Sequence, residues 1–293
     1  MKESVRLRVP ASSANLGPGF DTLGCALTLY NSFTFQQSEN TQITGCPPCF
    51  AGENNLTLRA FRAAEKFAGR EPTPVHIAER TYIPSAGGLG SSATFVVGGA
   101  MGANLLLGLG LSRQDIFEIT YGFEGHPDNV APAVYGGLTA AMTVDGKPYA
   151  TRLPIDTKFR FLLCIPDMHI DTHSARRVLP AGYSRADAVF TSSHAVALTA
   201  ALAKGDTELL SLALHDRMHE PYRRPLIRGI DEMEKLALEV GAHGFCISGS
   251  GATCLAIYTD KKFPHRMQEK LSTLSRKWRL IPTGADFDGA KEL

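Results

Sequence analysis

Apolar and polar residues alternate at the start of the chain, where Val5, Leu7 and Val9 are separated by serine and arginine. Successive side chains of a strand point to opposite faces, so this period of two predicts a strand with one buried face. Alternation, β-branched and aromatic residues, and turn residues at the ends predict further strands. We expect them at residues 23–36, 74–83, 135–144 and 159–165, and on both sides of a glycine-rich turn within 245–258.

Elsewhere apolar residues recur at helical spacing, as at Leu58 and Phe61 before Gly69. Ser112 followed by Asp115 resembles a capping box, which marks the start of a helix. Glycines after the last apolar position mark helix ends. Helices are therefore predicted over residues 56–68, 93–111, 112–124, 191–204, 206–218, 226–240 and 265–278.

The order of these elements shows no regular strand–helix–strand alternation, which favours an α+β fold with two lobes. A length of 293 residues fits one large domain or two medium ones. We place an N-terminal domain at residues 1–152 and a C-terminal domain at 153–293, joined somewhere within 150–158.

Composition and charge narrow the classes of function. Hydrophobic residues make up 44% of the chain and charged residues 20%, enough for a sizeable core. The net charge of +1 and the absence of a basic stripe argue against a nucleic-acid partner. Residues 1–10 lack the apolar stretch of a signal peptide, and no uninterrupted apolar run reaches the roughly 18 residues of a membrane span. We expect a cytoplasmic protein.

Six cysteines are present, and only Cys46 and Cys49 have C-x-x-C spacing. A zinc site would need two further ligands at matching spacing, and none lies nearby. We interpret these two as ordinary thiols in a loop.

Residues 84–93 read P-S-A-G-G-L-G-S-S-A, with Gly87, Gly88 and Gly90 just before a predicted helix. Glycines let the backbone approach an anion closely, and a helix start offers free N–H groups and a positive dipole end. The pattern predicts a phosphate-binding loop, although it lacks the G-K-[ST] ending of a Walker A loop. The alternative is a glycine-rich turn before a packed helix.

Three more polar segments stand out: P-A-S-S-A-N-L-G-P-G-F-D at 10–21, E-G-H-P-D-N-V at 124–130 and S-G-S-G-A-T at 248–253. In the first, Asn15 and Asp21 could bind a hydroxyl or an ammonium group. In the second, Glu124 could bind Mg²⁺, which prefers carboxylate and phosphate oxygens. Taken singly, each segment also fits an irregular loop, a helix end or a hairpin turn.

Taken together, in their order and spacing, these segments resemble the signature motifs of the GHMP kinases. The opening 10–21, G-H-P-D-N-V-A-P, T-H-S-A-R-R-V-L-P at 172–180 and E-P-Y-R at 220–223 are similar to the homoserine kinase branch. The resemblance spans residues 5–255. It implies an ATP- and Mg²⁺-dependent kinase that phosphorylates the side-chain hydroxyl of L-homoserine, typically as a homodimer. It also implies a ribosomal-protein-S5-domain-2-like N-terminal lobe with a left-handed βαβ unit, a ferredoxin-like C-terminal lobe, and the site between them.

The resemblance also implies roles for individual residues on the ATP side. Ser92 would contact Mg²⁺ through its hydroxyl, and Glu124 would be its carboxylate ligand. Because a single Gly125 separates Glu124 from His126, Glu118 is the alternative ligand. Asn55 would approach the adenine. The ATP phosphates would be bound by Pro84, Ser85, Ala86, Gly87, Gly88, Leu89, Gly90, Ser91 and Ser92.

On the substrate side, Asn15 and Asp21 would hold polar groups of homoserine, with Asp21 facing the ammonium. Arg176 and Arg223 would bind the carboxylate, which a guanidinium does with two hydrogen bonds. Arg177 and Arg224 are adjacent rivals for that role. The remaining residues implied near the substrate are His126, Asn129 and Gly251, with Asp128 as either a base or a supporting residue.

Three other functions compete with this one, and the third, a decarboxylase of the same fold, would need a different substrate pocket. A GHMP kinase for mevalonate, shikimate or a sugar would have no use for an acidic and two basic groups that fit a zwitterion. A nucleotide-binding relative without catalysis would be expected to have lost motif residues, whereas this chain keeps Ser92, Glu124 and Asn129.

Overall fold

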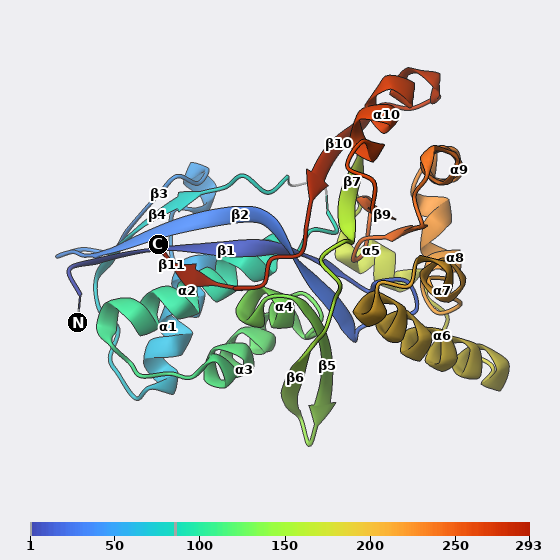
Figure 1. Cartoon of the computed structure of the whole chain (residues 1–293). Coiled ribbons are helices and arrows are strands. Elements are labelled where there is room, and N and C mark those ends of the chain that lie inside the picture. Colours follow the sequence, from blue (N-terminus) through green and yellow to red (C-terminus); the bar gives the residue numbers. More distant parts are fainter. Residues whose placement is uncertain (1, 85–86) are drawn as a thin grey trace.

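The computed structural model describes residues 2–84 and 87–293, and it has the predicted α+β fold with two lobes (Figure 1). In the first lobe β1 (Ser4–Ala14) pairs antiparallel with β2 (Leu23–Gln37). The sheet runs in the order β11-β1-β2-β4-β3, and β5 and β6 extend it from β2 as a hairpin. Its other strands are β3 (Gln42–Thr44), β4 (Val75–Arg80), β5 (Leu138–Val144), β6 (Lys147–Leu153) and β11 (Lys291–Glu292).

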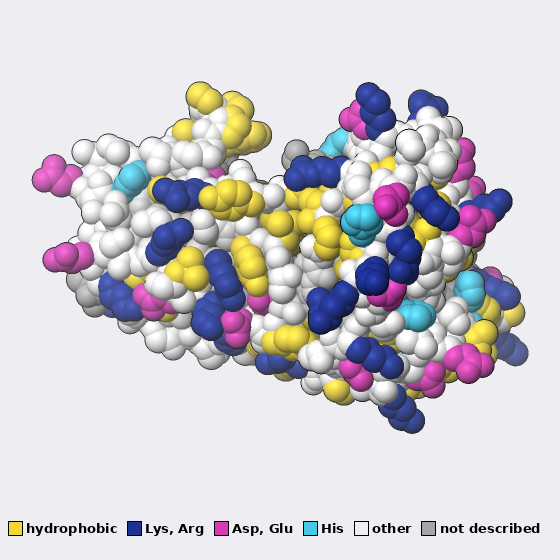
Figure 2. Space-filling model, turned by 45° about the horizontal axis from the view of Figure 1, so that its top comes forward, with side chains coloured by type: hydrophobic (Ala, Val, Ile, Leu, Met, Phe, Trp, Pro, Cys, Tyr) yellow, Lys and Arg dark blue, Asp and Glu magenta, His cyan; other side chains and the backbone are white. Residues whose placement is uncertain are grey.

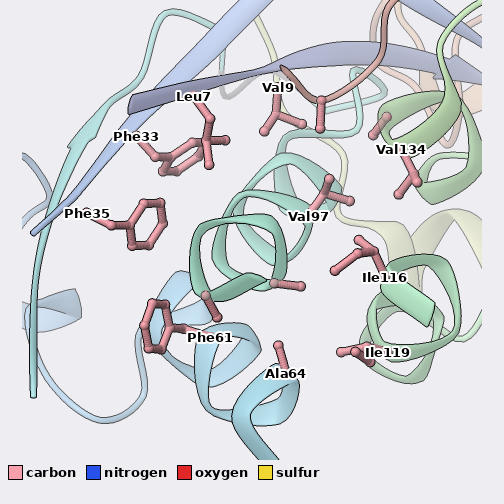
Figure 3. Packing of buried hydrophobic residues seen from close by; sticks show 14 of the residues in the cluster. Leu7, Val9, Phe33, Phe35, Phe61, Ala64, Val97, Ile116, Ile119 and Val134 are labelled. Atoms are coloured by element: carbon pink, nitrogen blue, oxygen red, sulfur yellow. The ribbon is translucent and has the colours of Figure 1, made fainter. Parts of the chain in front are cut away.

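Helices cover one face of this sheet (Figure 1). In the core between them, Phe33 and Phe35 of β2 face Phe61 of α1 and Val97 of α2 (Figure 3). The predicted apolar helix is α2, and its glycines fit this contact: a Cβ on Gly98 would lie 2.8 Å from the Phe33 ring. Close packing thus offsets the low helix propensity of glycine. The helices of this lobe are α1 (Leu56–Phe67), α2 (Ser91–Leu107), α3 (Arg113–Glu124), α4 (Val130–Tyr135) and the 3₁₀ turn η1 (Pro48–Phe50).

The second lobe is an antiparallel sheet in the order β10-β7-β9-β8 with flanking helices. Its first strand therefore lies between its third and its fourth, as in ferredoxin-like domains. The strands are β7 (Arg160–Pro166), β8 (Gly244–Ile247), β9 (Cys254–Tyr258) and β10 (Trp278–Thr283). The helices are α5 (Thr172–Arg177), α6 (Arg185–Lys204), α7 (Thr207–Ala213), α8 (Glu220–Arg223), η2 (Arg224–Leu226), α9 (Ile230–Val240), α10 (Phe263–Lys270) and η3 (Leu271–Thr273).

The two lobes share an apolar core. Leu23 and Leu138 from the first lobe pack in one cluster with Phe161, Leu198 and Leu255 from the second. The chain also returns at its end, because β11 pairs with β1 of the first sheet and both termini lie on the same side of the molecule (Figure 1). The division at 152/153 remains a prediction, since the last residues join the first lobe.

Several predicted elements are wrong in extent or type. The predicted helix 265–278 ends at Lys270, and Trp278 begins β10, where it pairs with Pro166 of β7. The pairing of this segment with β7 therefore outweighs the helical spacing of its apolar residues. The strand predicted from Tyr135 begins only at Leu138, because α4 occupies the residues before it and Gly136 and Gly137 turn the chain with positive φ.

The boundaries of other helices differ by several residues. α6 begins at Arg185, where Ser184 caps it by accepting from the N–H of Asp187. α7 ends at Ala213 and α9 begins at Ile230, so both are shorter than predicted. Within the described residues α6 is the one helix long and apolar enough to cross a membrane, and 22% of its apolar window is buried. Polar residues at 191–194 interrupt that window.

Candidate active site

A cavity of about 780 Å³ lies where the two lobes meet. That is the size of a small-molecule site. Most residues implicated by the sequence line it, although they come from segments far apart in the chain. They are Asn15, Asp21, Pro84, Gly87, Gly88, Leu89, Gly90, Ser91, Ser92, Glu124, His126, Asp128, Asn129, Arg176 and Arg223. Ser85 and Ala86 lie outside the described residues.

The glycine-rich loop meets the cavity at the start of α2. Gly90 precedes this helix with φ 61°, and it has no side chain that could accept from the first amides. A side chain there would collide, because a Cβ would lie 2.1 Å from Ser12 Oγ and 2.8 Å from Asn129 Oδ1. Free amides and the positive end of a 17-residue helix favour an anion at this point.

Two hydroxyl groups of the second lobe form hydrogen bonds with the backbone of the glycine-rich loop. Thr253 Oγ1 donates to the carbonyl of Gly87 at 2.7 Å, and Ser248 Oγ donates to that of Gly88 at 2.5 Å. These bonds fix the loop's carbonyls on the side of the second lobe. The 248–253 segment is therefore more than a hairpin turn, because it supports the glycine-rich loop.

The two predicted metal ligands lie together at the cavity. Ser92 Oγ, on the first turn of α2, donates to Glu124 Oε1 at the end of α3 over 2.5 Å. Glu118, two turns earlier on α3, is absent from the cavity lining. One carboxylate and one hydroxyl fit Mg²⁺ that takes its other ligands from phosphate and water. Among the described residues no group of three His, Cys, Asp or Glu could form a closed metal site, and Cys46 and Cys49 are free thiols.

His126 and Asp128 form a pair in the cavity wall, with His126 Nδ1 2.9 Å from Asp128 Oδ1. Asp128 is buried, with 1% of its surface exposed. Burial works against the charged imidazole, but the hydrogen bond and the charge of Asp128 outweigh it, so the pKa of His126 is raised. Next to them Asn129 Oδ1 accepts from Ser12 Oγ at 2.9 Å. The pair and Asn129 thus present fixed polar groups beside the phosphate loop.

Opposite charges gather at another part of the cavity. Asp21 and Arg176 form a two-point ion pair, with N–O distances of 2.7 and 3.0 Å. Arg223 is buried at 2% exposure, and its Nε and Nη1 donate to the carbonyls of Ala175 and Gly249. Burial and, after it, the positive charge of Arg176 lower the pKa of Arg223. Two neighbouring guanidiniums and one carboxylate leave a surplus of positive charge.

The other predicted residues lie away from the cavity. Asn55 caps α1, accepting from the N–H of Leu58 at 3.0 Å and donating to Glu79 at 3.2 Å, so its predicted contact with adenine stays a prediction. Gly251 is outside the lining, to which its neighbour Ser250 belongs. The rival arginines have other partners: Arg177 donates to Ser174, and Arg224 donates to Asp231 and Glu234.

Some residues of the site were missed in the sequence. Phe20 lies under both arginines, with its ring centre 5.2 Å from Arg223 Cζ and 5.7 Å from Arg176 Cζ. The sequence indicates Ser248 and Thr253 only as part of a turn and not as partners of the glycine-rich loop. The one signal that could have identified them is their pair of hydroxyls at the ends of a glycine-rich segment.

Comparisons with known proteins agree with this arrangement. The model of the GHMP kinases N terminal domain matches residues 55–137, and that of the GHMP kinases C terminal domain matches residues 198–276. A homoserine kinase of Thermosynechococcus vestitus is 46% identical over 254 residues, covering 85% of this chain and 84% of the relative. A homoserine kinase of Clostridium beijerinckii is 38% identical over 290 residues, covering 98% and 97%.

Solved structures of GHMP kinases are also similar to this chain. The crystal structure of homoserine kinase from Cytophaga hutchinsonii superposes with a TM-score of 0.90 at 29% identity, covering 100% of this chain and 98% of that one. Mevalonate kinase of L. major, at 14% identity, has a TM-score of 0.74 and covers 98% of both chains, which shows a shared fold. Identities of 46% and 38% to homoserine kinases over most of the chain place it in the homoserine kinase branch of the GHMP kinases. The chain belongs to the homoserine kinase family of the GHMP kinases.

Proposed function

We propose that the chain transfers the γ-phosphoryl group of ATP to the side-chain hydroxyl of L-homoserine, forming O-phospho-L-homoserine. The observation that carries this proposal is the placement of Asp21, Arg176 and Arg223 in the same cavity as the phosphate loop. Homoserine combines an ammonium and a carboxylate with a hydroxyl two carbons further along its side chain. The relatives named homoserine kinases support the same substrate.

The ion pair between Asp21 and Arg176 suggests how the zwitterion is bound. The ammonium would take the place of Arg176 at Asp21, and the carboxylate would take the place of Asp21 at Arg176. Arg223, whose side chain already donates to two carbonyls, would place a second positive charge beside the substrate carboxylate. Each charge lost from the first pair is thereby replaced, so neither Asp21 nor Arg176 is left without a charged partner.

Phosphoryl transfer passes through a loose transition state with charge spread over the γ-phosphate oxygens. The free amides after Gly90 and the dipole of α2 would stabilise that charge, and the loop would position the phosphates. Ser92 and Glu124 would hold Mg²⁺, which neutralises phosphate charge when bound. Asn129 and His126, held by Ser12 and Asp128, would orient the attacking hydroxyl.

Asp128 is proposed to orient His126 rather than to act as the base. We expect Asp128→Asn to keep kcat within about tenfold of the parent, since asparagine can still accept from His126 Nδ1 and a loose transition state needs little proton removal. General bases contribute roughly 10²–10⁴-fold. Steady-state kcat at saturating ATP and homoserine measures this. A loss above a hundredfold would make Asp128 the base.

The substrate is tested by following ADP release with Mg-ATP and a panel of alcohols. Turnover is expected with L-homoserine and not with mevalonate, shikimate or galactose. D-homoserine and L-serine test whether the clamp recognises the configuration and the chain length. Turnover with mevalonate, shikimate or galactose alone would keep the kinase and overturn the substrate. No turnover with any alcohol, despite measurable ATP binding, would favour a non-catalytic nucleotide-binding protein.

Two adjacent arginines offer a matched test of the clamp. We expect Arg176→Gln to raise KM for L-homoserine about 10- to 100-fold, because hydrogen bonds between charged groups contribute roughly 1.5–3 kcal/mol. Arg177→Gln changes the neighbouring residue of α5, whose guanidinium donates to Ser174 in the same helix, and should leave this KM within about twofold. KM for ATP should stay unchanged in both. Equal effects of the two substitutions would contradict the assignment.

We also propose that the protein works in the cytoplasm as a homodimer. The outer face of α6 supports the dimer: Val189 and Val196 are 63% and 71% exposed, and residues 188–203 carry no Asp, Glu, Lys or Arg. An uncharged helix face that exposes two valines fits an interface between subunits. On the face in Figure 2, Lys and Arg are interspersed with Asp and Glu, which fits a small-molecule partner better than nucleic acid.

A further inference from the structure

His219 is a fully buried residue behind the cavity, immediately before α8. Its Nε2 lies 2.9 Å from the carbonyl oxygen of Gly17 and 3.2 Å from that of Asn15. Carbonyl oxygens only accept, so Nε2 carries the proton. Its other nitrogen, Nδ1, lies 3.3 Å from Arg223 Nη1, which can only donate. The hydrogen-bond network therefore assigns a neutral ring that donates on one side and accepts on the other.

The surroundings hold the ring in this state. Burial lowers the pKa of His219, with the charge of Asp216 acting against that shift. The carboxylate of Asp216 accepts from the backbone N–H groups of residues 218, 219 and 220, and its Oδ2 lies 3.7 Å from Nε2 of the ring. Phe20 stacks on the imidazole at 5.4 Å with an angle of 24°. These contacts orient the ring with Nε2 toward the two carbonyls and Nδ1 toward Arg223.

We propose that His219 is a positioning residue that sets the Arg223 guanidinium for the carboxylate of the substrate. This inference rests on the proposed function. Nη1 of Arg223 donates to the carbonyl of Gly249 as well as facing His219, and Nε donates to the carbonyl of Ala175. Because the guanidinium is planar, fixing Nε and Nη1 fixes the direction of the whole group.

The same imidazole connects Arg223 to the part of the clamp that would bind the ammonium. Its Nε2 holds the backbone of Asn15, and the side chain of Asn15 accepts from the N–H of Asp21 at 2.8 Å. The amide of Asn15 also donates to Gly249 O, the carbonyl that Arg223 binds. Because Asn15 keeps its own bond to Gly249 when the Nε2 donor is lost, we expect the Arg223 side of the ring to carry most of the effect.

Two substitutions separate the two sides of the ring. The oxygen of His219→Asn can reach the place of Nδ1, so this variant keeps an acceptor for Arg223. The amide nitrogen of His219→Gln can reach the place of Nε2, so this variant keeps only the donor to the carbonyls. We expect KM for L-homoserine to rise about fivefold in His219→Gln and less than about twofold in His219→Asn, since the roughly 1 kcal/mol contributed by one hydrogen bond corresponds to about fivefold. KM for ATP should change in neither.

A double-mutant cycle tests whether the effect passes through Arg223. In an Arg223→Gln background, His219→Gln should add no further change in KM for L-homoserine. An additive change, a larger effect of His219→Asn than of His219→Gln, or an equal rise in KM for ATP would each overturn the inference. Failure of the unsubstituted protein to phosphorylate homoserine would instead overturn the proposed function.

A spectroscopic measurement tests the protonation of the ring without any substitution of His219. In ¹⁵N NMR of protein labelled at histidine, His219 should show a protonated Nε2 and a bare Nδ1 at neutral pH. The bare Nδ1 resonance should shift in Arg223→Gln. A protonated Nδ1, or a resonance unchanged in that variant, would overturn the inference.

Discussion

Gly88→Ala is expected to lower kcat/KM for ATP by at least about a hundredfold. Gly88 has φ 81°, and a Cβ there would lie 2.2 Å from the backbone oxygen of Ser248. Backbone cannot move aside as a flexible side chain can, so either the phosphate loop or the 248–253 turn must shift. A displacement of about 1 Å in catalytic positioning can cost roughly 10²-fold in rate.

Gly110→Ala is the matched control for this substitution. Gly110 has a similar φ of 73°, but no atom lies within 4 Å of the place its Cβ would take. It therefore carries the same backbone strain, about 1 kcal/mol, without a collision. We expect a small loss of thermal stability and unchanged kinetics. If both alanines lowered kcat/KM equally, strain rather than contact with the second lobe would be the cause.

The glycine-rich loop could be predicted from the sequence because its residues are consecutive in the chain. Glycines before an apolar helix predict an anion site, and the resemblance to the GHMP kinases added Ser92 and Glu124 as metal ligands. These roles stay predictions, and the structure places Ser92 and Glu124 side by side at the cavity. Contacts between lobes left no local pattern. Ser248 and Gly88 are 160 residues apart, and Arg176 and Asp21 are 155 apart, so only the fold brings them together. The resemblance predicted that Asp21 and Arg176 bind charged groups of the substrate, and it could not show that the two pair with each other.

For the fold as well, elements determined by local sequence were predictable, and elements that depend on distant partners were not. The alternation at 5–9 and the buried helix after the loop were confirmed, because one face of each packs against a continuous core. The predicted helix 265–278 was wrong because Trp278 gains a partner strand in β7 that no nearby residue reveals. β11 was missed for a similar reason: its two residues are a strand only because β1 lies beside them.

Glu124→Gln is expected to lower kcat about a hundredfold or more and to raise the Mg²⁺ concentration needed for half-maximal activity. Glutamine can still accept from Ser92 Oγ, which lies 2.5 Å from Glu124 Oε1, so the ends of α2 and α3 should keep their places. What is lost is the negative charge. Asp128, another carboxylate of the cavity lining, is paired with His126 instead, so we expect it not to compensate for the lost charge.

Glu118→Gln distinguishes loss of a metal ligand from loss of a charge anywhere on α3. Glu118 lies on the same helix but outside the cavity lining, and its substitution should leave kcat and the Mg²⁺ dependence within about twofold. Titrating MgCl₂ at fixed ATP in both variants and the parent measures the two quantities together. If Glu118→Gln produced the loss and Glu124→Gln did not, the ligand would lie two turns earlier on α3. A loss of kcat in Glu124→Gln at unchanged Mg²⁺ dependence would make Glu124 a group that positions Ser92 rather than a metal ligand.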